Sequence, residues 1–315
     1  QDACRKHTFD LAIFDEAHHT AARVNCRDAL ALYDRNIKIS KRLFLTATPA
    51  IYDASDSSRY NSMDNETVYG PRAYHLSFSE AVKRKIITPW KIVVSAFTRE
   101  DVDNELLKNG EVILSGEAVR PEQVAAQLGI AKIAKDYDVK KIITYHGSIN
   151  KARSFTCDRP EGISTHLKGF DTDYISCYQT AGECQSIMQQ FRNPNSTNVL
   201  ATVDKLNEGV DVPAVDMVSF IDPIMSKRNI VQRGGRAVRN HEWIDENGNK
   251  KTKKFGIIHL NVFVEPNEGE TVGEALVRAK FDHVRAVLEA MREEDDSLND
   301  LLVIAAENLA RTGEI

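Results

Sequence analysis

Short apolar runs, each closed by polar or turn residues, constrain the fold of this chain more than any other feature. Runs of this kind are typical of strands buried on both faces, as in a parallel sheet flanked by helices. Helical stretches stand between the runs, and such alternation indicates βαβ units. The sequence therefore predicts an α/β fold. The expected strands are residues 11–14, 43–45, 92–94, 142–145, 199–202, 217–221 and 257–264.

Helix starts are marked by residues that cap or preset a first helical turn. An N-cap Ser or Thr accepts a hydrogen bond from a first-turn N–H group, and a Glu three positions later completes a capping box. A Pro at the first helical position already has a helical φ. Helices are expected to begin at Ser77 with Glu80, at Pro121, at Ser226, and at Thr271 with Glu274, the last opening a mostly helical tail.

Length and composition limit the class of protein. The chain has 315 residues, which at about 150 residues per domain predicts two domains. Because its net charge is −5, any nucleic-acid site must be formed by local basic clusters and not by a basic field over the whole molecule. No apolar run approaches the ~20 residues that a membrane span needs, so no membrane partner is expected. The five cysteines are scattered without a C-x-x-C pair, which favours a reducing, intracellular location, cytoplasmic or nuclear.

Two features indicate domain limits. Gln1 leads almost at once into the first expected strand, which favours a start inside a domain. Pro89 and the polar stretch 99–116, which lacks a clear period, predict a boundary between two α/β units near residue 90.

The stretch 245–254 is expected to form the exposed tip of a β-hairpin. Asn247 and Gly248 supply the positive φ angles of a tight turn. A calcium-binding EF-hand loop is excluded, because Lys250 and Gly256 stand where that loop needs Gly and Glu.

The first cluster with chemistry follows the apolar run 9–14, which ends in Asp15 and Glu16 with His18 close behind. Open α/β sheets place their ligands at the carboxyl ends of parallel strands. There Asp15 can hold Mg²⁺, and Glu16 can polarise a water for attack on a γ-phosphate. Acidic residues at a strand end also serve as helix N-caps, which is the structural alternative.

Two more clusters follow later strands. Thr46 and Thr48 place two hydroxyls at the end of the second expected strand, at the same sheet edge. Residues 202–213 join a strand to a turn that holds Gly209 and Asp211, for which an ordinary strand-to-helix loop is the alternative.

A fourth cluster lies in the helix expected from Ser226. Arg233, Arg236 and Arg239 recur every third residue, so neighbours share a helical face and can stabilise charge on a transferred phosphoryl group. The alternative is a solvated basic helix. Gly234 and Gly235 disfavour it, because glycines weaken a helix and are tolerated where a backbone or ligand comes close.

Taken in this order, the clusters resemble the motifs of superfamily 2 helicases and translocases over about residues 5–265. Residues 15–18, Asp-Glu-Ala-His, match the DEAH form of motif II, and Thr-Ala-Thr at 46–48 matches motif III. Residues 232–239 match the Q-x-x-G-R-x-x-R form of motif VI.

Two further segments extend the resemblance. Residues 202–213 are similar to motif V in the motors of type I restriction enzymes and related DEAH-type helicases. Val203 stands where DEAD-box RNA helicases usually place Thr, which favours DNA over RNA. Residues 143–148 resemble motif IV.

The resemblance implies three kinds of role for the matching residues. Those acting on ATP and Mg²⁺ are Asp15 for the metal, Glu16 for water activation, Gly209 and Asp211 beside the nucleotide, Gln232 at the γ-phosphate, and Arg236 and Arg239 as arginine fingers. Those coupling the nucleotide site to the second domain are His18, Thr46 and Thr48. Those contacting the nucleic-acid backbone are Ser148 and Thr202, whereas Arg233 and His19 are assigned no role.

The resemblance also implies an architecture of two RecA-like parallel-sheet domains and a helical tail. The first domain, residues 1–90, is expected to be truncated at its N-terminus. The second spans residues 91–265, and the tail spans 266–315.

The implied activity is that of an ATP-dependent nucleic-acid helicase or translocase, with ATP hydrolysed at the cleft between the two domains. The chain contains no G-x-x-x-x-G-K-[ST] phosphate-binding loop, so on its own it is expected to be inactive. Two alternatives stay open at this stage: a non-catalytic nucleic-acid-binding module derived from a helicase, and the motor portion of a restriction system.

Overall fold

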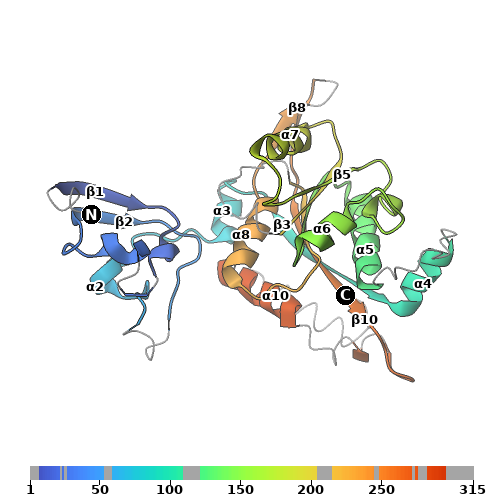
Figure 1. Cartoon of the computed structure of the whole chain (residues 1–315), viewed down its shortest axis with the longest axis horizontal. Helices are drawn as coiled ribbons and strands as arrows, with labels where there is room; N and C mark the ends of the chain where they lie inside the picture. Colours follow the sequence, from blue (N-terminus) through green and yellow to red (C-terminus); the bar gives the residue numbers. More distant parts are fainter. Residues whose placement is uncertain are drawn as a thin grey trace. The chain divides into compact units, whose positions relative to one another are not determined.

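The computed structural model describes residues 7–21, 23–24, 27–52, 59–108, 121–203, 215–244, 248–271, 274–275 and 282–295. The chain divides into two compact units, Gln1–Leu76 and Ser77–Ile315 (Figure 1).

The first unit contains a parallel pair of strands. Strands β1 (Thr8–Phe14) and β2 (Lys38–Phe44) run in register with Phe14 opposite Phe44, so their carboxyl ends lie side by side. The turns η1 (Ala17–Thr20) and η2 (Arg27–Leu32) lie between the strands in sequence, and the short helix α2 (Glu66–Tyr69) follows them.

Burial on both faces was expected for these two strands, and that expectation is wrong. Leu11 and Ile13 are more than half exposed, at 54% and 60%. Among the described residues their sheet has only these two strands. The apolar run identified the strand correctly but not its surroundings.

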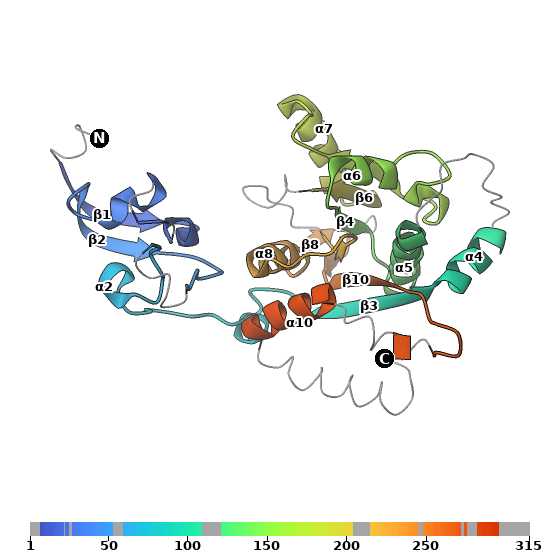
Figure 2. The same cartoon turned by 60° about the horizontal axis from the view of Figure 1, so that its bottom comes forward.

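The second unit is built on a six-stranded parallel sheet in the order β3-β10-β7-β4-β6-β5. The strands are β3 (Trp90–Thr98), β4 (Lys141–Tyr145), β5 (Asp171–Ile175), β6 (Asn198–Thr202), β7 (Met217–Phe220) and β10 (Gly256–Val264). The helices are α3 (Phe78–Lys83), α4 (Arg99–Lys108), α5 (Pro121–Tyr137), α6 (Ile149–Phe155), η4 (Ile163–Thr165), α7 (Ala181–Arg192), α8 (Lys227–Ala237) and α10 (Asp282–Glu294) (Figure 2).

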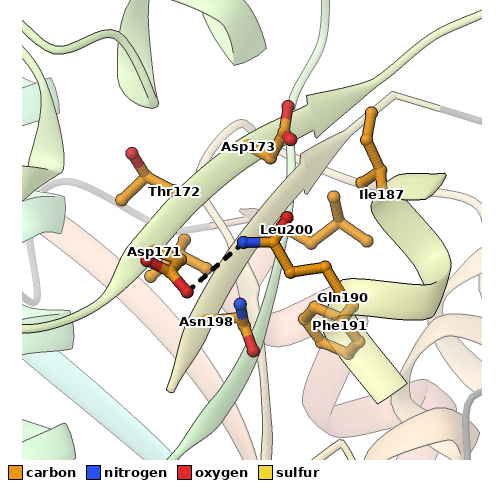
Figure 3. Close-up of a pocket in the computed structure, with 9 residues that line it drawn as sticks. Asp171, Thr172, Asp173, Ile187, Gln190, Phe191, Asn198 and Leu200 are labelled. Atoms are coloured by element: carbon orange, nitrogen blue, oxygen red, sulfur yellow. Dashed lines mark hydrogen bonds between the residues drawn. The ribbon is translucent and has the colours of Figure 1, made fainter. Parts of the chain in front are cut away.

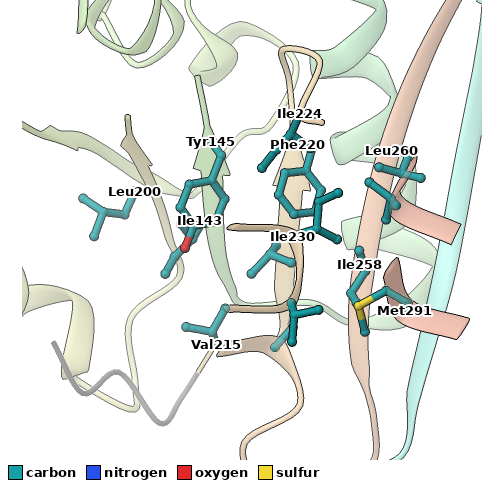
Figure 4. Close-up of a cluster of buried hydrophobic side chains, with 14 of the residues drawn as sticks. Ile143, Tyr145, Leu200, Val215, Phe220, Ile224, Ile230, Ile258, Leu260 and Met291 are labelled. Carbon is teal, nitrogen blue, oxygen red and sulfur yellow. The ribbon is translucent and has the colours of Figure 1, made fainter. Parts of the chain in front are cut away.

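Two apolar clusters show that helices cover both faces of this sheet. On one face, Ile143 and Tyr145 of β4 pack with side chains of α7, α8 and α10 (Figure 4). On the other, Ile142 of the same strand packs with α5, α6 and η4. Strands β4, β6 and β7 are buried along their whole length, as their continuous apolar runs predicted. The α/β class is thereby confirmed.

The expected helix caps are present. The Ser77 hydroxyl accepts a hydrogen bond from Glu80 N at 3.3 Å, and the Ser226 hydroxyl accepts one from Asn229 N at 3.4 Å. Pro121 is the first residue of α5. In the tail, the Thr271 hydroxyl accepts from Glu274 N at 3.2 Å, and residues 296–315 lie outside the described residues.

The hairpin is also confirmed. Strands β8 (Glu242–Ile244) and β9 (Lys250–Thr252) pair antiparallel, and Gly248 in their turn has φ +78°. Asn247 lies outside the described residues.

Two elements differ from expectation. Helix α4 lies in the polar stretch 99–116, where no helix was expected because the stretch lacks a clear period, and Thr98 with Asp101 marks its start, because Asp101 N donates to the Thr98 hydroxyl at 3.2 Å. No strand was expected at β5, whose sequence Asp-Thr-Asp-Tyr-Ile is mostly polar because it lies at the edge of the sheet. Among the described residues, no helix combines the length and the apolar character needed to cross a membrane.

Two buried histidines make the second unit sensitive to acid. His259 hydrogen-bonds Ser95 at 2.7 Å and Ser219 at 2.8 Å, and burial lowers its pKa to about 3. For His146, burial outweighs the nearby Asp222 and lowers the pKa to about 4. Both folded-state values lie below the ordinary 6.5, so this stability is complete above pH 6.5 and is lost as the pH falls toward 4 and 3.

We therefore expect the unfolding free energy to be about 2 kcal/mol lower per histidine at pH 5 than at pH 7. Denaturant titration followed by the fluorescence of Trp90 and Trp243, both in the second unit, measures it. In His146→Gln the loss on acidification should be about half as large. Equal unfolding free energies at the two pH values would contradict the burial argument.

Candidate functional site

In the first unit, the acidic pair lies where β1 ends. Leu45 N donates to Phe14 O and Ala17 N donates to Leu45 O, both at 2.9 Å, so the ends of β1 and β2 are joined by backbone hydrogen bonds. Asp15 is exposed, and its Oδ1 accepts from Glu16 N at 3.0 Å. Glu16 has φ 49°, a left-handed conformation that non-glycine residues rarely adopt and that often marks functional sites.

The DEAH segment and the Thr-Ala-Thr segment meet in this unit. Nδ1 of the buried His18 lies 2.9 Å from Thr46 Oγ1 and 3.4 Å from Glu16 Oε2. Thr48 N donates to the same Thr46 hydroxyl oxygen at 3.2 Å. The Thr48 hydroxyl is buried and has no hydrogen-bond partner among the described residues. Glu16, His18, Thr46 and Thr48 therefore form one connected group.

In the second unit, helix α8 carries Gln232, Arg233 and Arg236. Arg236 is only 3% exposed. The Arg233 guanidinium lies over the ring of Tyr145, 4.7 Å from its centroid. Burial raises the pKa of Tyr145 to about 12, although Arg236 and Arg233 act to lower it.

Arg239 does not share the helical face expected for it. Helix α8 ends at Ala237, and Arg239 forms an antiparallel bridge with Ile87 instead. Its side chain is exposed. The chain that follows the helix contacts distant segments, Arg239 through this bridge and Asn240 through Thr88.

Several polar side-chain atoms of the second unit are buried without a hydrogen-bond partner among the described residues. Gln232 Nε2 and Thr202 Oγ1 are among them. Thr202 ends β6 and is fully buried. A buried polar group that lacks a partner costs about 1–3 kcal/mol, so such groups mark places where a ligand or water is expected to bind.

Ser148 lies in the loop after β4 and caps helix α6. Its hydroxyl accepts from Lys151 N at 3.3 Å. The same loop is held by Asp222, which accepts from Gly147 N at 2.8 Å and forms an ion pair with Lys151. Although burial acts against it, these contacts lower the pKa of Asp222. Asp222 was missed in the sequence, where its place just after an expected strand could have revealed it. Gly209 and Asp211 lie outside the described residues.

The donor set in the first unit fits Mg²⁺ with a nucleotide. Mg²⁺ is usually held by one or two carboxylates together with water and phosphate oxygens. The exposed Asp15 carboxylate suits that role. The described residues contain no group of three or more His, Cys, Asp or Glu side chains able to hold a metal by themselves.

A small pocket of about 30 Å³ lies between β5, β6 and α7 (Figure 3). Its polar lining includes Asp171, Asp173 and Asn198, and Gln190 Nε2 donates to Asp171 Oδ2 at 3.4 Å. None of the residues predicted to act on ATP or nucleic acid lines it.

Sequence comparison finds helicases. Residues 124–241 match the family described as the helicase conserved C-terminal domain. The chain is 23% identical over 250 residues to IRC3 of Saccharomyces cerevisiae, named as an ATP-dependent helicase, covering 75% of this chain and 34% of that protein. It is 25% identical over 246 residues to UvrABC system protein B of Clostridium acetobutylicum, covering 74% and 32%. The chain thus spans about a third of the length of these relatives.

Solved structures show the same fold. The Type ISP restriction-modification enzyme LlaBIII bound to DNA aligns with a TM-score of 0.72 and 25% identity, over 93% of this chain and 20% of that chain. A fragment of the HsdR subunit of a type I restriction enzyme from Vibrio vulnificus aligns with a TM-score of 0.51 and 16% identity, over 84% and 50%.

The expected RecA-like sheet of helicases is therefore confirmed in the second unit. The domain match, the helicase relatives and the likeness to restriction enzymes agree with the DEAH and Q-x-x-G-R-x-x-R motifs. Residues 124–241 carry the helicase conserved C-terminal domain, and these findings together support a superfamily 2 helicase related to restriction-enzyme motors.

Proposed function

We propose that this chain is the catalytic portion of an ATP-driven DNA translocase or helicase. The observation that carries the proposal is the connected group of Glu16, His18, Thr46 and Thr48. In this group the Glu16 carboxylate, which follows β1, is linked through the His18 imidazole to Thr46, which follows β2. Such a link lets a change at the phosphates reach the rest of the motor.

The residues of the first unit have distinct proposed roles. Asp15 holds Mg²⁺, which neutralises charge on the phosphate oxygens when it is bound. Glu16 accepts a proton from the attacking water. His18, Thr46 and Thr48 couple the nucleotide to movement of the motor.

The second unit supplies the groups that sense and stabilise the γ-phosphate. Gln232 contacts it, and Arg236 and Arg239 stabilise the charge that develops on it. Gly209 and Asp211 border the nucleotide.

Ser148 and Thr202 are proposed to contact the nucleic-acid backbone. Contacts to phosphates carry no base preference, which is what a motor moving along a strand requires. The Ser148 hydroxyl caps helix α6 by accepting from Lys151 N. In this proposal it donates its own hydrogen to a phosphate oxygen while it keeps that bond. Thr202 is fully buried, so its side chain needs a local rearrangement to do the same.

DNA is the preferred substrate in this proposal. LlaBIII, at 25% identity and a TM-score of 0.72, is bound to DNA in its solved structure. The same likeness favours a second, narrower candidate, in which the chain is the motor of a restriction system inside the cell. We further propose that residues 1–90 and 91–265 form the two motor domains, that 266–315 form the tail, and that the whole protein supplies a P-loop.

ATP turnover tests the proposal. The chain alone is expected to show almost no hydrolysis, because the carboxylates act on phosphates that a P-loop must hold. The whole protein should hydrolyse ATP faster when DNA is added, and less so with RNA of the same sequence. Absence of turnover in the whole protein, with or without nucleic acid, would instead support a non-catalytic binding module. Robust turnover by the chain alone would contradict the need for a P-loop.

A further inference from the structure

Lys253 is a buried lysine that no motif includes. It follows β9 directly and is 6% exposed, although lysine is almost never buried unless its charge is paired. Its ammonium donates hydrogen bonds to three backbone carbonyl oxygens. The acceptors are Val215 O, Ala237 O and, at 3.4 Å, Arg239 O.

These carbonyls lie at or just beyond the ends of two segments of the candidate site. Val215 is the first described residue after the motif V segment and leads into β7. Ala237 is the last residue of α8, and Arg239 follows it. The last carbonyls of a helix have no partner within the helix and carry partial negative charge, so a cation there is favourable. Lys253 therefore joins the residue that leads from motif V into β7 to the end of motif VI.

Other contacts show how closely the end of α8 is held. Thr88 N donates to Val238 O at 2.8 Å, and the Thr88 hydroxyl donates to Asn240 Oδ1 at 2.7 Å. A Cβ added to Gly256 would lie 1.9 Å from Ala237 O, which only glycine at that position avoids. These contacts hold Val238 and Asn240, whereas Lys253 holds Ala237 and Arg239.

We propose that Lys253 is a positioning residue, which sets the orientation of Arg236 and Arg239 by binding the backbone carbonyls of Ala237 and Arg239. Arg236 directly precedes one acceptor, and Arg239 itself is another. The inference rests on the proposed function, in which both guanidiniums act on the γ-phosphate.

The Lys253 ammonium loses its charge when the pH is raised, which offers a test in the wild-type chain. Burial outweighs the nearby Asp216 and lowers the pKa of Lys253 to about 8. A neutral amine has two N–H donors for three carbonyls. His241 also lies near; burial, opposed by the charge of Asp216 and helped by that of Lys253, lowers its pKa below the ordinary 6.5, so the midpoint of its titration lies below the range from pH 7 to pH 9.

The experiment follows the carbon-detected Cζ signals of Arg236 and Arg239 in the NMR spectrum of the labelled chain from pH 7 to pH 9. In the wild type both signals should move with a midpoint near pH 8. In Lys253→Arg, which keeps its charge throughout, they should stay fixed. Lys141, whose pKa burial also lowers to about 8, stays unchanged in this variant and so cannot produce the difference.

A substitution series completes the test. Lys253→Met should shift both signals at pH 7, whereas Lys254→Met, which alters the exposed neighbour, should not. The proposal would be overturned if the Cζ signals of Arg236 and Arg239 changed neither with pH nor in Lys253→Met. If Lys253→Met does not fold, the comparison of wild type with Lys253→Arg still decides.

Inorganic tripolyphosphate separates this inference from the proposed function. If the arginines bind phosphate, adding it should shift their signals, and Lys253→Met should weaken the apparent affinity about tenfold, as the loss of one charged hydrogen bond predicts. Wild-type signals that do not respond to tripolyphosphate would count against the proposed function, while the pH comparison would still decide the positioning role.

Discussion

Replacing Arg236 with lysine is expected to lower ATP turnover of the whole protein by about 10³-fold or more at saturating nucleic acid. Arg236 is on the last turn of α8 and almost completely buried, near the hydroxyl of Tyr145. Its planar guanidinium can hold two phosphate oxygens at once, whereas an ammonium offers a single point of charge. Lysine therefore keeps the charge and loses the geometry.

Arg228→Lys is the matched control, because Arg228 is on the same helix and exposed. Its turnover should equal that of the wild type. The competing view is that Arg236 binds the nucleic-acid backbone. In that case Arg236→Lys would weaken nucleic-acid affinity and its salt dependence while saturated turnover survived. Measuring turnover together with affinity at two salt concentrations separates the two views.

The parts of the fold that were predictable are those in which local sequence and burial agree. Strands β4, β6 and β7 lie inside the sheet, so their side chains are apolar on both faces and form continuous runs. Strand β5 lies at the edge, where polar residues are tolerated, and its sequence resembles a loop. Helix α4 was missed because its apolar positions show no clear period, although Thr98 and Asp101 form a cap.

Part of the candidate site could also be inferred from topology. Parallel strands that follow one another place their carboxyl ends at one edge, and this is why residues after β1 and β2 were expected to meet. The contact between His18 and Thr46 agrees with that expectation.

Contacts that depend on packing between distant segments could not be inferred. The stacking of Arg233 on Tyr145 joins a helix to a strand far away in the sequence. Helix α8 ends before Arg239, whose backbone contacts Lys253 and forms a bridge with Ile87. The spacing of three residues from Arg233 to Arg239 predicted one helical face. That prediction failed at Arg239, because helical periodicity contains no information about where a helix ends.

Glu16→Gln is the second substitution expected to have a large effect, with turnover of the whole protein falling by about 10²- to 10⁴-fold. Glutamine keeps the size and shape of glutamate and cannot accept a proton from the attacking water. Glu16 belongs to the connected group because its Oε2 lies 3.4 Å from His18 Nδ1. A glutamine side-chain oxygen can occupy the same place. ATP binding should therefore be unchanged, so that binding and hydrolysis separate in this variant.

Glu16→Asp shows whether the length of the side chain matters at this position, and Glu66→Gln is the control. Glu16→Asp keeps the carboxylate and tolerates the left-handed backbone at φ 49°, but its side chain is shorter by one methylene. A partial loss of turnover in Glu16→Asp, smaller than in Glu16→Gln, is expected if a correctly placed base is what the reaction needs. Glu66→Gln, at an exposed position in the same unit, should leave turnover unchanged. Wild-type turnover in Glu16→Gln would remove Glu16 from the mechanism, because that substitution takes away both the charge and the basicity that the proposed role requires.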